Sequence, residues 1–169
     1  MNVVLWVLAA IGVMGAIDTI AFHEIASRLA ARPAAWRELR LHACRDVFYL
    51  ILFPTLAWNE PHGAFAGGIA AIVVAEVVVT AFDFIVEWET RVLPTGERAL
   101  HAVIAVTYGA FAALLAPSLL TWATLPAGFA PARYGVVSWF LTLLALGVAF
   151  WSVRDGVAAV RMHRLAATV

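Results

Sequence analysis

The chain of 169 residues contains no lysine and a single cysteine, and these two absences exclude several kinds of chemistry. Without lysine the protein cannot form a Schiff base with retinal or pyridoxal phosphate. Cys44 alone excludes an internal disulfide, a cysteine-ligated iron–sulfur cluster and a CxxCH haem attachment. P-loop, GxGxxG and GxSxG patterns are also absent. The formal net charge is zero, so nothing in the composition indicates binding to nucleic acid.

Charged residues are scarce, at 13% of the chain, whereas hydrophobic residues reach 64%, and both values lie far from those of soluble domains. A membrane-spanning helix needs about 20 mostly apolar residues. We therefore expect an all-α, polytopic transmembrane bundle of about five helices, forming one integral membrane domain over residues 1–169. The apolar N-terminus lacks a basic region and a small-residue cleavage site, which indicates a retained helix and not a signal peptide. The expected helices cover residues 3–22, 36–58, 64–88, 97–116 and 134–153.

The segments between these stretches contain turn-forming residues. The first helix is expected to continue to the Arg–Pro pair at residues 32–33. Residues 59–63 and 93–96 predict tight turns. Residues 117–131 are expected to lie at the membrane interface, where tryptophan is favoured, or to re-enter the membrane. Residues after 153 are expected to form a short tail.

Arginine is distributed unevenly between the two ends of the expected helices. Only Arg133 falls on one side, and the positive-inside rule makes the opposite side cytoplasmic. We therefore expect a plasma or inner membrane protein with its N-terminus outside and its C-terminus in the cytoplasm. The asymmetry also favours an odd number of spans. The arginines on the expected cytoplasmic side are Arg28, Arg32, Arg37, Arg40, Arg45, Arg91, Arg98, Arg154, Arg161 and Arg164.

Acidic and histidine side chains gather near the arginine-rich ends of four expected helices. An acidic residue deep in a membrane helix costs about 2.5–3.5 kcal/mol, so these positions require partners, protonation, water or a function. The first helix contributes Asp18, His23 and Glu24, the second His42 and Asp46, the third Glu76, Asp83 and Glu87, and the fourth Glu97 and His101. With Arg45 and Arg98 as the only bases in the same zone, seven potential negative charges exceed the positive charges by five.

Helical spacing places several of these side chains on shared faces. Glu76, Asp83 and Glu87 form one narrow stripe, because steps of seven and eleven residues nearly complete whole turns. Two pairs have the i, i+4 spacing. They are His42 with Asp46 and Glu97 with His101, and Tyr108 continues the second line seven residues later.

The first helix is less regular in this respect. On an α-helix His23 and Glu24 lie about 120–140° around the axis from Asp18. All three side chains can reach one site only if the helix bends or ends there. We therefore expect one of His23 and Glu24 to lie outside the site.

Mixed carboxylate and imidazole ligands suit iron, manganese or zinc, and pairs of such ligands form dinuclear sites. The ligand types and the four-helix arrangement resemble those of ferritin-like di-iron carboxylate proteins. Their Glu-x-x-His pairs are absent here, so the resemblance extends to no family. We expect a dinuclear centre, with iron preferred and manganese or zinc as alternatives. The candidate ligands are Asp18, His23, Glu24, His42, Asp46, Asp83, Glu87, Glu97 and His101.

The leading functional hypothesis is a membrane oxidoreductase or hydroxylase that acts on a lipophilic small molecule from the bilayer. Glu76 would carry protons, Tyr108 would bind a ligand or carry a proton, and Arg45 and Arg98 would orient carboxylates. A zinc hydrolase would use the same ligands. The alternatives are a proton-coupled transporter, a haem b protein with two histidine axial ligands, and an accessory subunit held by arginine–carboxylate pairs. A homo-oligomer or a larger membrane complex is compatible with each hypothesis.

Overall fold

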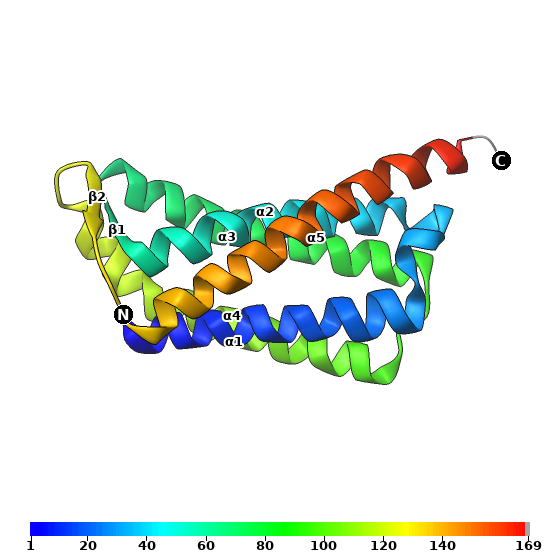
Figure 1. Ribbon diagram of the computed structural model, residues 1–169, viewed down its shortest axis with the longest axis horizontal. Helices are drawn as coiled ribbons and strands as arrows, with labels where there is room; N and C mark the ends of the chain where they lie inside the picture. Colours follow the sequence, from blue (N-terminus) through cyan, green and yellow to red (C-terminus); the bar gives the residue numbers. More distant parts are fainter. Residues whose placement is uncertain (168–169) are drawn as a thin grey trace.

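The computed structural model describes residues 1–167, most of which belong to five long helices (Figure 1). Successive helices run in opposite directions along the long axis of the molecule. The predicted all-α fold of five helices is thereby confirmed over the described residues. The helices are α1 (Asn2–Ile17), α2 (Trp36–Trp58), α3 (Ala64–Thr90), α4 (Thr95–Ala123) and α5 (Val136–Ala166).

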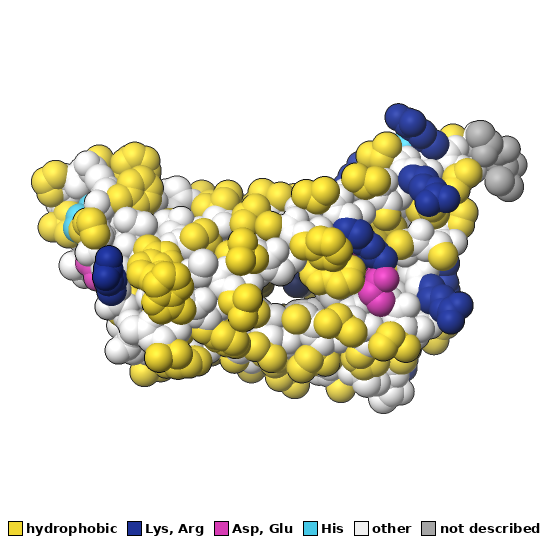
Figure 2. Space-filling view, in the orientation of Figure 1, with side chains coloured by type: hydrophobic (Ala, Val, Ile, Leu, Met, Phe, Trp, Pro, Cys, Tyr) yellow, Lys and Arg dark blue, Asp and Glu magenta, His cyan; other side chains and the backbone are white. Residues whose placement is uncertain are grey.

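The two ends of the bundle differ in structure. At one end, α1 continues into the π-helix η1 (Asp18–Ser27), and two 3-10 turns, η2 (Leu29–Ala31) and η3 (Pro33–Ala35), lead to α2. This end also holds the α3–α4 linker and most of the arginines, which Figure 2 shows in dark blue on the right. We call it the arginine-rich end. At the opposite end β1 (Asn59–His62) pairs with β2 (Gly128–Pro131) in an antiparallel ribbon.

Within residues 1–167, four helical stretches are long and apolar enough to cross a membrane. The charges in the first half of α2 keep that helix from qualifying by composition, although it runs through the bundle beside α5 (Figure 1). Hydrophobic side chains cover much of the visible outer surface in Figure 2. Charged groups inside and apolar groups outside suit a protein dissolved in lipid, so the four spans indicate an integral membrane protein. The spans are Asn2–Ser27, Ala64–Thr90, Thr95–Ala123 and Val136–Ala166.

An apolar core fills the half of the bundle that lies toward the β1–β2 ribbon. Leu8 of α1, Phe53 and Leu56 of α2, Phe111 of α4 and Leu141 of α5 are all completely buried there. Interiors of this kind pack as densely as organic crystals. Because apolar side chains fill this half, the polar side chains of the interior lie mainly in the other half, toward the arginine-rich end.

The first helix differs from the expected one, because its regular α-helical part ends at Ile17 and a π-helix follows. A π-helix forms i→i+5 hydrogen bonds, so its turns hold more residues than those of an α-helix. The segment ends where Arg28 adopts a left-handed conformation with φ 49°. The expectation of continuous α-helix to residues 32–33 was therefore wrong, and the wide turn changes which side chains of this segment face inward.

The fourth helix was expected to end at residue 116, before an interfacial or re-entrant segment at residues 117–131, and this helix boundary was wrong. Helix α4 continues through Pro117 to Ala123, and residues 128–131 form a strand. The strand pairs with residues 59–62, which were expected to form only a tight turn. Proline removes one helical hydrogen bond, but a long helix packed on its neighbours can continue through it.

The expected tail after residue 153 is helical up to Ala166, and residues 168–169 lie outside the described part of the chain. Helix α5 has 31 residues and therefore a length of about 46 Å. This length exceeds the hydrocarbon thickness of about 30 Å. The apolar run ends at residue 153, but the helix itself continues to Ala166, beyond the part suited to lipid.

Gly63 begins α3 with φ 57° and ψ −128°, a conformation that strongly favours glycine. A Cβ atom at this position would lie 2.7 Å from the Ala127 backbone. We expect Gly63→Ala to lower the apparent Tm more than Gly135→Ala. Gly135 has a similar φ of 69°, but a Cβ atom there would meet no neighbouring atom within 4 Å. Thermal unfolding of both variants in one detergent checks this. Equal losses of Tm in the two variants would show that backbone strain, of about 1–3 kcal/mol, explains the effect, and that the close approach to Ala127 does not.

Candidate metal centre

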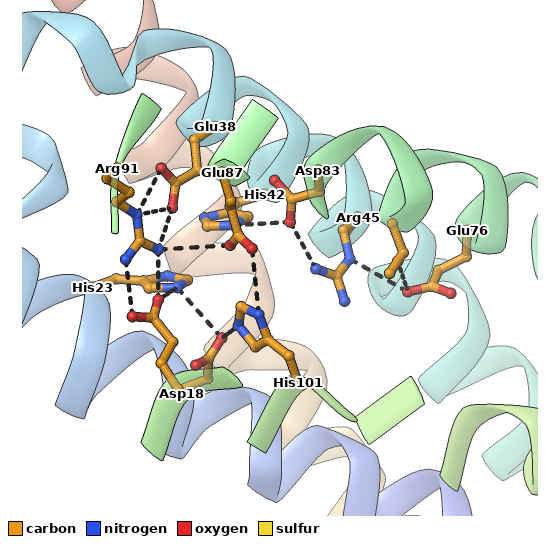
Figure 3. A network of polar contacts seen from close by, with 12 residues as sticks. Asp18, His23, Glu38, His42, Arg45, Glu76, Asp83, Glu87, Arg91 and His101 are labelled. Atoms are coloured by element: carbon orange, nitrogen blue, oxygen red, sulfur yellow. Dashed lines mark hydrogen bonds and ion pairs between the residues drawn. The ribbon is translucent and has the colours of Figure 1, made fainter. Parts of the chain in front are cut away.

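Arg91 lies just after α3, and carboxylates from three helices surround its guanidinium (Figure 3). Its Nε and Nη2 donate to Glu38 of α2 at 2.7–3.2 Å, and its Nη1 and Nη2 donate to both oxygens of Glu97 of α4. Glu87 lies 3.6 Å away, and Ser27 accepts a further hydrogen bond. Burial alone would lower the pKa of Arg91, but the hydrogen bonds to Glu97 and Glu38 outweigh it and raise the pKa. The guanidinium is therefore permanently charged.

Three imidazoles lie beside these carboxylates (Figure 3). His101 of α4 contacts Asp18 through Nε2 at 3.0 Å and Glu87 through Nδ1 at 3.4 Å. His23 of η1 lies 3.4 Å from the same oxygen of Asp18. The rings of His23 and His42 stack, with centroids 4.4 Å apart and an interplanar angle of 3°. Segments η1, α2, α3 and α4 thus each supply histidine or carboxylate groups to one cluster.

A second arginine extends the network deeper into the bundle. Arg45 of α2 donates to Asp83 through Nη1 at 3.1 Å and to Glu76 through Nε at 3.3 Å. His42 Nε2 lies 3.1 Å from the same Asp83 oxygen, so Asp83 connects this arginine to the histidines. Tyr49 donates a hydrogen bond to Glu76 at 3.1 Å. Every charge in this branch has a partner of opposite sign.

Several ligand atoms nearer the histidines form no hydrogen bond. Within residues 1–167, the completely buried atoms without one include Asp18 Oδ1, His23 Nε2, His42 Nδ1 and Glu87 Oε1. Two of these four keep longer ion-pair contacts, His23 Nε2 with Asp18 at 3.4 Å and Glu87 Oε1 with Arg91 at 3.6 Å. Leaving buried polar atoms unsatisfied costs about 1–3 kcal/mol each, so native proteins rarely do so without a reason. These four atoms belong to residue types that bind transition metals.

The same residues form two groups whose geometry suits a metal ion. In each group, one candidate ligand atom from every residue lies within 4.8 Å of the others. His23 belongs to both groups. The first group is Asp18, His23, Glu97 and His101, and the second is His23, Glu38, His42 and Glu87.

The charges of the network support a cationic ligand. Its six carboxylates face only two arginines, which leaves four uncompensated negative charges if the imidazoles are neutral. Each of the six residues is at most 7% exposed, so water cannot screen this excess well. One or two divalent ions would neutralise most of it. The carboxylates are Asp18, Glu38, Glu76, Asp83, Glu87 and Glu97.

A cavity of about 140 Å³ lies directly beside the cluster. His23, His42 and His101 form part of its polar wall, and Phe53 and Leu144 form part of its apolar wall. In Figure 2 an opening passes between the helices at mid-length, and an arginine is visible behind it. We call this cavity the chamber. It provides room for a small reactant next to the candidate ligands.

The structure separates the predicted site residues into two sets. It brings six of the nine predicted ligands into the two groups, namely Asp18, His23, His42, Glu87, Glu97 and His101. Asp83 contacts His42 and Arg45, and Asp46 lies on the chamber wall. Glu24 forms an ion pair with Arg154 instead. This outcome agrees with the expectation that only one of His23 and Glu24 joins Asp18, and the π-helix explains why it is His23.

Two predicted roles at arginine and tyrosine meet a different geometry. Arg98 is exposed and forms no ion pair with the cluster among the described residues. Adjacent helical positions point about 100° apart, and Glu97 takes the inward one. Tyr108 donates its hydroxyl hydrogen to the backbone oxygen of Val73 at 3.1 Å, away from the histidines.

Sequence reasoning missed Glu38, Arg91 and Ser27. The signal for the first two was present, because Glu38 precedes His42 by four residues and Arg91 follows Glu87 by four. Arg91 was assigned only to the cytoplasmic side, since it lies between the expected third helix, which ends at residue 88, and the turn at residues 93–96. Ser27 could not be identified without the path of the π-helix.

No family model, curated protein or solved structure matches this chain. The chemistry of its residues is therefore the basis for a function of the candidate site.

Proposed function

We propose that the buried cluster binds two transition-metal ions and that the protein is a metal-dependent membrane oxidoreductase or hydroxylase. The observation that supports this most is a pair of buried atoms, Asp18 Oδ1 and His42 Nδ1, that have no polar partner among the described residues. Asp18 belongs to one of the two adjoining His/carboxylate groups and His42 to the other. The ligands contain no thiolate, and carboxylate with imidazole suits iron or manganese as well as zinc. We propose iron because a dinuclear iron centre supplies redox chemistry when bound.

The remaining residues of the network would position the ligands. Arg91 binds Glu38 and Glu97 through paired hydrogen bonds, which fixes the planes of both carboxylates. Arg45 donates a single hydrogen bond to Asp83, which in turn contacts His42. Glu76 lies one step deeper and is held by Arg45, so we propose that it carries protons to and from the chamber. The arginine-rich end would face the cytoplasm.

Metal analysis of the purified protein tests this proposal. We expect inductively coupled plasma mass spectrometry to find one to two equivalents of iron, manganese or zinc per chain in detergent. A control for this measurement is the double variant Glu60→Ala/His62→Ala. It removes a His/carboxylate pair at the ribbon end, outside the cluster, where the two side chains lie 3.8 Å apart. It should keep its metal. Absence of stoichiometric metal across iron-, manganese- and zinc-supplemented expression would contradict the proposal and favour a structural arginine–carboxylate network.

A further inference from the structure

A second cavity, of about 320 Å³, lies between α3 and α4. Its exposed lining is mostly apolar and includes Val77, Ala81 and Gly109. The polar residues of the lining are Arg45, Glu76, Thr80 and Tyr108. Val77 is 52% exposed, and Ala81 and Gly109 are also exposed, so this cavity is a groove on the outer surface of the bundle. We call it the lipid groove. In a membrane, acyl chains would surround its open side.

The lipid groove and the chamber share a wall. Five residues line both of them, namely Arg45, Thr80, Phe84, Ile104 and Ala105. The ring of Phe84 stacks on His101, with centroids 5.5 Å apart. The inner end of the groove is therefore only one aromatic ring away from a candidate metal ligand.

One polar group at this junction has unused hydrogen-bonding capacity. Arg45 donates through Nε to Glu76 and through Nη1 to Asp83, but its Nη2 has no hydrogen-bond acceptor among the described residues. The side chain is 18% exposed, and it lines both cavities. Nη2 can therefore donate to an oxygen atom of a molecule in the groove.

The charges around this donor select against an anion. Glu76 and Asp83 already compensate the charge of Arg45. Asp46 adds a carboxylate to the chamber wall, whereas the carboxylate of Asp155, also in that wall, is paired with Arg154. A carboxylate or phosphate at the junction would meet this negative field, whereas a neutral carbonyl oxygen could accept the free N–H without that penalty.

From these observations we infer that the lipid groove binds a neutral lipophile with a carbonyl group at one end, the quinones being the class that fits. The tail lies between α3 and α4, and the carbonyl accepts a hydrogen bond from Arg45 Nη2. This inference rests on the proposed function, since the position beside His101 makes such a molecule the substrate of the metal centre. It assigns the route of access as lateral, from the bilayer.

Photoaffinity labelling in lipid nanodiscs tests the inference, with an azido-benzoquinone carrying a ten-carbon tail as the probe. The key variant is Gly109→Leu, which fills the groove, because no atom lies within 4 Å of a Cβ at that position. The control is Gly67→Leu, an equally open and exposed position on α3 outside the groove. We expect saturable labelling of peptides from α3 and α4. Gly109→Leu should weaken it by at least about tenfold, and Gly67→Leu should not.

Unlabelled competitors test the nature of the head group. The unlabelled ten-carbon quinone should compete at about tenfold lower concentration than decanoic acid or decane. Stronger competition by decanoic acid, or labelling that does not saturate and is equal in the two glycine variants, would overturn the inference. Metal content is measured on the same samples. Bound metal without specific labelling refutes only the inference, whereas specific labelling without metal refutes the proposed function and leaves the groove as a quinone-binding site.

Discussion

Arg91→Met is expected to destabilise the metal-free protein by roughly 3–5 kcal/mol, the usual cost of removing one partner from a buried ion pair. Glu38 and Glu97 are both 0% exposed, and in this variant Glu38 loses three hydrogen bonds and Glu97 loses two. The apparent Tm in excess chelator should fall by on the order of 10 °C. Circular dichroism during heating in detergent measures it.

Metal should reverse much of this loss, because an ion in the cluster compensates the same carboxylates. We therefore expect added manganese or zinc to raise the Tm of Arg91→Met by more than that of the wild type. Arg98→Met is the control, since Arg98 is exposed and removing it leaves no buried carboxylate alone. A Tm for Arg91→Met close to that of Arg98→Met would show that the Arg91 ion pairs contribute little.

The triple variant Arg91→Met/Glu38→Gln/Glu97→Gln separates charge from packing. It removes the buried charges of both signs together, which is often nearly neutral for stability. The metal-free triple variant should thus be more stable than metal-free Arg91→Met. If it is equally unstable, lost packing around the guanidinium and not an unpaired charge explains the effect.

His23→Ala is expected to remove all bound metal, whereas His101→Ala and His42→Ala should each remove about one equivalent of the two. His23 belongs to both ligand groups, whereas His101 belongs only to the first and His42 only to the second. Each imidazole nitrogen has one lone pair, so His23 would serve both ions as an imidazolate that offers Nδ1 to one ion and Nε2 to the other. Losing one of four protein ligands should lower the affinity enough for the ion to be lost during purification in detergent. Mass spectrometry of each purified variant gives the equivalents.

Equal losses in the three histidine variants would contradict two separate ions and indicate one ion shared by all the ligands. Circular dichroism confirms that each variant is folded. His62→Ala serves as the matched histidine control, because His62 lies on the β1–β2 ribbon, at the opposite end of the bundle from the cluster (Figure 1).

Most of the fold could be predicted from hydropathy, because the apolar runs coincide with the parts of the helices suited to lipid. The limits of hydropathy have the same origin. The charged final turns of α5 lie beyond the apolar run, and Pro117 lies within α4, so hydropathy and turn signals ended both helices too early. The strand pairing of residues 59–62 with 128–131 joins segments far apart in sequence, which no local pattern reports.

The candidate site was predictable in its location but only partly in its members. Helical spacing identified His42, Glu87 and His101, since each lies on a regular α-helix whose period is known. The same rule applied fully would have added Glu38. His23 could not be separated from Glu24, because their directions depend on a π-helix that no propensity scale predicts.

That π-helix has a consequence for recognising relatives of this protein. Widening one turn accommodates an extra residue without moving the chain on either side, so the register between Asp18 and His23 depends on chain length as well as on residue identity. A relative one residue shorter here would return to an α-helix and present a different side chain beside His101. A gap in an alignment between residues 18 and 27 would then mark a change in the candidate metal centre, even where every histidine and carboxylate is retained.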